Sequence, residues 1–186
     1  MDAPTLVCAQ RWGIPGANYY FANRERWTIS LDELADVGIM DEYSYVHPDL
    51  IMPLTKVMNT LMHHGYGMTL EDAYRSPETY ALVRSKVAAQ KGEEFVRRLF
   101  SFDTLPHATG RAVDVALVDL KTGKKVWLRN DGRDGIEASF VGFYRDRQDP
   151  ESRNYQARQD ILHDAMREAG FVFGTKLETW HFELPE

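Results

Sequence analysis

Apolar residues recur at helical spacing in several parts of the chain. The clearest case follows His47-Pro48 and predicts a buried amphipathic helix from about Asp49 to His64, which Gly65 closes. Its apolar positions are Leu50, Leu54, Val57, Met58, Leu61 and Met62.

Three further helices are indicated by start and stop signals. Ser76, followed by Pro77, is a typical helix start and predicts a helix that continues to about Gln90. An apolar stripe predicts a helix from about Tyr155 to Ala169, which Gly170 ends. A short helix over Ser30–Asp36 is expected to be capped by Ser30.

Strand patterns lie mainly in the second half of the chain. Ala112–Leu120 alternates, turns at residues 121–124 and returns through Lys125–Leu128, which predicts a hairpin. Met68–Tyr74, Phe171–Phe173 and Leu177–Leu184 are also expected to be strands. Helices that precede a mostly antiparallel sheet indicate an α+β fold.

Length and composition suit one domain that covers residues 1–186, in which residues 1–48 are a less certain N-terminal extension. Trp12, Tyr19–Phe21 and Trp27 crowd this extension, as a small separate core or a lid over a substrate, and we favour the core. The single cysteine, Cys8, excludes an internal disulfide and a cysteine-rich metal site. His, Asp and Glu are therefore the only plausible metal ligands.

Charge and hydropathy exclude two classes of partner. The formal charge is −6, from 28 acidic and 22 basic residues, and the cations do not cluster, so nucleic acid is not expected as a partner. No apolar run reaches the ~18 residues of a membrane span. No leader sequence is visible, which favours a cytoplasmic protein, or a periplasmic one if a signal peptide has been removed. The sequence does not indicate an oligomeric state.

A first group of chemically suggestive residues lies around the predicted strand that begins at Ala112. His107 in a loop is followed by Asp114, which shares a strand face with Ala112 and Ala116. A carboxylate between two alanines on the expected core-facing side leaves room for an ion. The alternative is a surface histidine and an aspartate that caps a turn.

Two other segments carry candidate catalytic groups. Glu178 lies three residues before His181, and such a carboxylate can take a proton from a metal-bound water. A regular strand would place these two residues on opposite faces, so either the strand is bulged or only one residue points into a site. Arg75, between a strand and a helix, can donate to a developing oxyanion. A half-buried histidine and salt-bridged Glu178 and Arg75 are the structural alternatives.

The order of these motifs is specific when they are taken together. Tyr74-Arg75-x-Pro77, then His107-x-x-Gly110-x-Ala112-x-Asp114, then Glu178-x-Trp180-His181 resembles the zinc D,D-peptidases, the family of VanX-type D-alanyl-D-alanine dipeptidases, D,D-carboxypeptidases and phage endolysins. The resemblance covers roughly residues 50 to 184.

This resemblance implies a single zinc ion held by His107, Asp114 and His181, with water as the fourth ligand. It also implies that Glu178 is the general base and that Arg75 stabilises the oxyanion. The expected activity is hydrolysis of D-Ala-D-Ala or related peptidoglycan-derived peptides. A lysin-like peptidoglycan endopeptidase and a non-catalytic zinc-binding module are the alternatives.

Departures from the family pattern concern the substrate. The serine that is usual two residues before the first histidine is Leu105, and one tryptophan of the usual Glu-Trp-Trp-His is Thr179. The acidic residue with which the dipeptidases hold the substrate amine is not matched. Asp131, Asp134 or Glu137 are candidates to replace it, so the substrate-binding residues stay undetermined.

Overall fold

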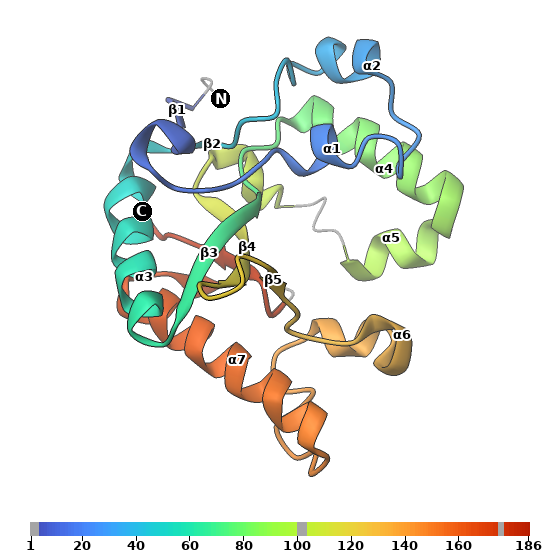
Figure 1. Cartoon of the computed structure of the whole chain (residues 1–186). Helices are drawn as coiled ribbons and strands as arrows, with labels where there is room; N and C mark the ends of the chain where they lie inside the picture. Colours follow the sequence, from blue (N-terminus) through green and yellow to red (C-terminus); the bar gives the residue numbers. More distant parts are fainter. Residues whose placement is uncertain (1–3, 100–103, 175–176) are drawn as a thin grey trace.

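The computed structural model describes residues 4–99, 104–174 and 177–186 and has the predicted α+β fold, with helices packed on an antiparallel sheet (Figure 1). The helices are α1 (Tyr19–Ala22), α2 (Leu31–Asp36), α3 (Ile51–His63), α4 (Pro77–Lys91), α5 (Glu93–Leu99), α6 (Asp131–Asp134) and α7 (Pro150–Glu168). The strands are β1 (Val7–Cys8), β2 (Tyr45–Val46), β3 (Tyr66–Asp72), β4 (Ala112–Asp119), β5 (Lys125–Val126), β6 (Val172–Phe173) and β7 (His181–Glu183).

Strand β4 is the centre of the main sheet. The order is β3-β4-β7-β6, β5 also pairs with β4, and every pairing is antiparallel. Asp114 of β4 lies opposite His181 of β7 on one side and Asp72 of β3 on the other. An irregularity between Leu70 and Asp72 shifts the register of β3 at this point. The sheet therefore brings polar residues of three strands to one place.

The two faces of β4 have different surroundings. Val113, Val115 and Leu117 belong to the main hydrophobic core, together with buried residues of α3 and α7. Asp114 and Ala116 alternate with them and line a cleft. The expectation that the face of Asp114 points to the core was wrong. The larger apolar side chains of this strand alternate with the alanines, and burying them leaves the alanine face to the cleft.

The N-terminal residues form a second core with the helices beside the sheet. Its buried members come from α1, α2, α4, α5 and the turns near them: Tyr20, Trp27, Ile29, Leu34, Val83, Val87 and Val96. Trp12 is not part of it and is 61% exposed. Gly16 runs so close to β3 that a Cβ there would lie 2.7 Å from the Cβ of Leu70. Tyr19, Tyr20, Phe21 and Trp27 are therefore core residues, although Tyr19, Tyr20 and Trp27 also border the cleft.

Several element boundaries differ from the predictions. Helix α7 begins at Pro150, with Asp149 as its N-cap, and not at about Tyr155 as predicted. The apolar stripe did not reveal the first turn, because that turn is polar. Helix α5 was not predicted. The expected strand Leu177–Leu184 is regular only over β7. No helix in the described part of the chain is long and apolar enough to cross a membrane.

Candidate active site

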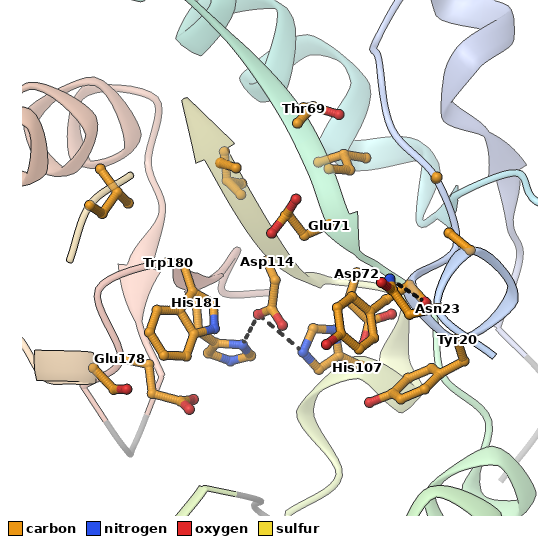
Figure 2. A pocket seen from close by; sticks show the side chains of 18 of the residues that line it. Tyr20, Asn23, Thr69, Glu71, Asp72, His107, Asp114, Glu178, Trp180 and His181 are labelled. Carbon is orange, nitrogen blue, oxygen red and sulfur yellow. Dashed lines mark hydrogen bonds and ion pairs between the residues drawn. The ribbon is translucent and has the colours of Figure 1, made fainter. Parts of the chain in front are cut away.

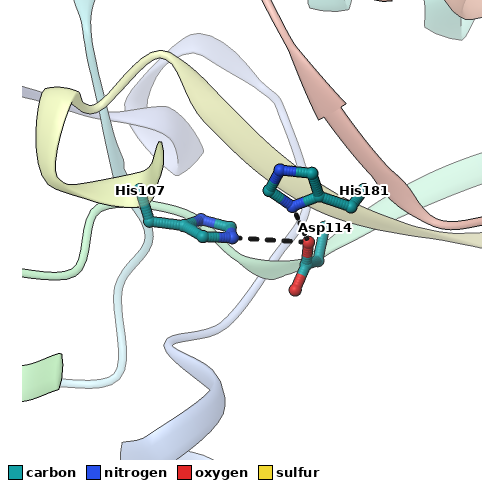
Figure 3. A group of neighbouring side chains, drawn as sticks. All are labelled: His107, Asp114 and His181. Carbon is teal, nitrogen blue, oxygen red and sulfur yellow. Dashed lines mark hydrogen bonds and ion pairs between the residues drawn. The ribbon is translucent and has the colours of Figure 1, made fainter. Parts of the chain in front are cut away.

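Three residues that are far apart in the sequence converge in the lining of the cleft, and Figure 3 shows their side chains together. Nε2 of His107 lies 3.5 Å from Oδ1 of Asp114, and Nδ1 of His181 lies 2.8 Å from the same oxygen. Their candidate ligand atoms all lie within 4.8 Å of one another. The two histidines are buried and Asp114 is half-buried. The three predicted ligands are thus close enough to share one ion.

The orientation of His107 is fixed by contacts of its backbone and its ring. A short 3-10 helix, Pro106–Thr109, carries the residue, and the hydroxyl of Tyr80 accepts a hydrogen bond from its backbone N–H at 3.0 Å. The ring atom Nδ1 lies 2.7 Å from the carbonyl oxygen of Ala73. A carbonyl only accepts, so Nδ1 is the ring nitrogen that donates to Ala73, and Nε2 is the ring nitrogen that faces Asp114.

His181 is held by carboxylates on both sides of its ring. Oε1 of Glu183 lies 3.2 Å from Nε2, on the side opposite Asp114. Gly174 leaves room for this arrangement, because a Cβ there would lie 2.3 Å from Cδ2 of His181 and 2.8 Å from Oε1 of Glu183. Glu183 therefore leaves Nδ1 as the ring nitrogen that faces the candidate site.

The donor set fits a catalytic type of zinc site. Two imidazole nitrogens and one carboxylate oxygen are ligands that zinc accepts, and three protein ligands leave a position open. Burial alone would raise the pKa of Asp114, but electrostatic and hydrogen-bond interactions with His107 and His181 outweigh burial and hold that pKa well below its usual value. Asp114 is thus an anion that can hold a cation.

Glu178 lines the same cleft as His181 (Figure 2). Leu177 has a positive φ of 53°, and Glu178 forms an isolated bridge with Phe140, so this segment leaves the regular strand before β7 begins. The strict alternation of a regular strand consequently does not apply here, and Glu178 and His181 both reach the cleft. Burial and then the charge of Asp114 raise the pKa of the Glu178 carboxyl to about 7.

Arg75 is a buried cation between two aromatic rings. Its guanidinium carbon lies 5.1 Å from the ring centre of Tyr20 and 4.4 Å from that of Tyr80, and its Nη2 donates to Asp72. Burial disfavours the charge, but Tyr20 and Asp72 outweigh this effect and raise the pKa of Arg75 above its usual value. Its side chain lines the cleft with a fixed positive charge.

Only one of the three acids considered for the substrate amine lines the cleft. This is Asp131, which pairs with Arg129. The carboxylate of Asp134 is only 5% exposed and binds Arg133, and Glu137 pairs with Arg98 away from the cleft lining.

Sequence reasoning missed the residues that support the site. Asp72 holds Arg75, Tyr80 contacts both Arg75 and His107, and Glu183 holds His181. Two spacings are local signals: Asp72 lies three residues before Arg75, and Glu183 lies two residues after His181 on the same strand. Tyr80 carries no signal in the sequence, because it reaches the site only through the packing of α4.

Comparison with known proteins gives a partial sequence match and a shared fold. No model of a protein family matches the chain. A D-alanyl-D-alanine dipeptidase of Synechocystis sp. (strain ATCC 27184 / PCC 6803 / Kazusa) is 34% identical over 83 residues, which cover 41% of this chain. The match spans only 33% of that dipeptidase, about a third of its length.

Among solved structures, the LdcB LD-carboxypeptidase is similar with a TM-score of 0.50 and 18% identity, over 75% of this chain and 59% of that one. The L-Ala D-Glu endopeptidase ChiX of Serratia marcescens gives a TM-score of 0.36 and 18% identity, over 75% of this chain and 80% of that one. The LdcB likeness shows a common fold. Sequence match and common fold together confirm that the chain resembles the zinc D,D-peptidase family of D-alanyl-D-alanine dipeptidases and D,D-carboxypeptidases.

Proposed function

We propose that the protein is a zinc-dependent peptidase that hydrolyses D-Ala-D-Ala or related peptidoglycan-derived peptides. The observation that carries the proposal is the meeting of three metal-ligating groups with a buried glutamate and a buried arginine in one cleft. His107, Asp114 and His181 would hold the ion. When bound, zinc supplies a Lewis acid that polarises the peptide carbonyl and activates water.

Glu178 is the proposed general base. Its pKa of about 7 means that near neutral pH a large fraction of the carboxyl is ionised and ready to take a proton from water. Once protonated, the same group returns the proton to the amine that leaves when the peptide bond breaks. Burial in the cleft wall keeps the carboxylate away from bulk water.

Arg75 is the proposed stabiliser of the negative charge that develops on the carbonyl oxygen. Its pairing with Asp72 and the two tyrosine rings fixes the guanidinium before the substrate arrives, so little reorganisation is needed in the transition state. A module that only binds zinc needs neither this cation nor a glutamate with a raised pKa, which disfavours the non-catalytic alternative.

The test is hydrolysis of free D-Ala-D-Ala and of an N-acylated peptide that ends in D-Ala-D-Ala. We expect zinc-loaded protein to cleave at least one of them and a chelator to abolish the activity. Glu178→Ala is expected to lower kcat by about 10²-fold or more. Glu94→Ala, which changes an exposed glutamate of α5, is the matched control. Full activity of the Glu178 variant would remove the assigned base.

A peptidoglycan endopeptidase is the second candidate, because the cleft extends well beyond the three ligands. It predicts cleavage of longer wall peptides and of intact sacculi in preference to the free dipeptide. A cytoplasmic location stays a prediction, and a periplasmic one fits a substrate from the cell wall.

A further inference from the structure

The cleft is larger than a dipeptide of two alanines requires. Its volume is about 970 Å³, near the upper end of the roughly 300–1,000 Å³ of small-molecule pockets. One wall includes residues of β5 and α6, and the opposite wall includes residues of α1, α4 and α5 (Figure 1). A substrate that fills the space must reach past the three candidate ligands to at least one of these walls.

The wall at β5 and α6 is neutralised by its own ion pairs. Lys125 pairs with Glu71 and lies over the ring of Trp127, at 5.0 Å from its centre. Arg129 pairs with Asp131, and its guanidinium carbon also lies 3.8 Å from the ring centre of Trp180. Both acids of this wall therefore already have a cation, and a substrate ammonium would have to displace it.

The other acidic residues that line the cleft are committed as well. Asp72 binds Arg75, Asp114 contacts both histidines, and Glu178 is the proposed base. Among the described residues, the cleft thus offers a free amine no uncommitted carboxylate. This argues against a substrate that is recognised by its ammonium group.

The wall at α1, α4 and α5, called the helical wall below, carries an excess of positive charge. Arg26, in the turn after α1, and Lys91, the last residue of α4, are exposed and line the cleft. No carboxylate forms an ion pair with either of them within residues 4–99, 104–174 and 177–186. The guanidinium carbon of Arg26 lies 5.1 Å from the ring centre of Trp27, which is buried in the wall. A ring contact restrains the cation without neutralising it.

We propose that Arg26 and Lys91 form a carboxylate-binding subsite, and that the substrate is an extended, N-acylated peptide whose carboxylate lies at this helical wall. The inference rests on the proposed peptidase function and narrows its substrate class. The carboxylate comes either from an acidic residue upstream of the cleaved bond or from the free C-terminus. Guanidinium and ammonium groups bind a carboxylate through charge-assisted hydrogen bonds.

Equilibrium binding tests the subsite separately from turnover. Three N-acylated peptides that end in D-Ala-D-Ala are titrated into zinc-loaded Glu178→Gln protein. One contains an upstream glutamate, the second has glutamine there, and the third has the glutamate and a C-terminal carboxamide. The titrations are repeated with Glu178→Gln proteins that also carry Arg26→Gln or Lys91→Gln. Arg84→Gln, on the same helix α4 but outside the cleft lining, is the control for loss of one positive charge.

We expect the added changes to weaken binding of the glutamate peptide about tenfold, less at high salt, while the control changes nothing. If the glutamine peptide is insensitive, the upstream acid is the ligand. If the carboxamide peptide is insensitive, the ligand is the C-terminal carboxylate. The subsite would be overturned if all three peptides bound with equal affinity to the Glu178→Gln protein and to its Arg26 and Lys91 variants. It would also be overturned if none of the peptides bound. Failure of the wild-type protein to cleave peptides that bind in this way would instead overturn the proposed function.

Discussion

Replacing Glu178 by glutamine is expected to stabilise the metal-free protein, and the gain should grow with pH. The carboxyl has a pKa of about 7 in the folded chain and 4.5 as its ordinary value, with burial as the main cause of the difference. A raised pKa means that the folded state favours the protonated form. Folding stability from this group is therefore fully present below pH 4.5 and is lost as the pH rises through 7.

The size of the effect follows from the shift. At about 1.4 kcal/mol per pKa unit, ionisation of Glu178 costs the folded protein roughly 2–3 kcal/mol between pH 5 and pH 8. Glutamine keeps the shape of the side chain and does not ionise, so the variant avoids this cost. Zinc should reduce the difference, because a nearby cation favours the ionised carboxylate.

Urea unfolding of both proteins in the presence of a chelator, at pH values from 5 to 8, measures this difference. Titrating groups that do not interact with Glu178 cancel in the comparison. Glu94→Gln, at an exposed position of α5, is the control, for which we expect a constant difference. A stability difference between wild type and Glu178→Gln that does not change with pH would refute the argument that burial penalises this charge.

Three other substitutions test the support of the site. Glu183→Ala removes the carboxylate behind His181 and should weaken zinc binding about 10- to 100-fold in a chelator competition, with Glu183→Gln retaining more affinity. Gly174→Ala introduces a Cβ against the ring of His181. It should lower the free energy of unfolding measured in urea by about 1–3 kcal/mol and also weaken zinc binding. Asp72→Asn leaves the buried charge of Arg75 poorly compensated and should lower stability by about 3 kcal/mol; an unchanged unfolding midpoint would contradict the buried pair.

The elements with strong local signals were predictable from the sequence. Helix α3 has an apolar stripe that meets the core, and α4 begins at its Ser76 cap, so local preference and packing agree. The cleft side of β4 was not predictable in this way. Alternation shows that Asp114 shares a face with alanines, but which face is covered depends on where α3 and α7 pack, and that is set by distant parts of the chain.

The candidate ligands were predicted from the order and spacing of motifs, whereas the residues that support them are positioned by contacts between distant segments. The orientation of His107 depends on the carbonyl of Ala73, and backbone groups give no sequence signal. The positive φ of Leu177 was equally hidden, because leucine is an unusual residue for that conformation. It explains why Glu178 and His181 reach the same cleft although regular alternation would separate them.

Asp114 and His181 are paired across β4 and β7, so an ion that binds both residues requires the correct alignment of these two strands. Strand β7 has only three residues, and Phe182, the residue after His181, lies in the core on the opposite face of the sheet. A slip of one residue would turn His181 into the core and present an apolar ring to Asp114. Such a chain would lose one of the three ligands. Because an ion that binds only the correctly aligned chain stabilises it by mass action, zinc added during refolding should enrich the native register over slipped forms.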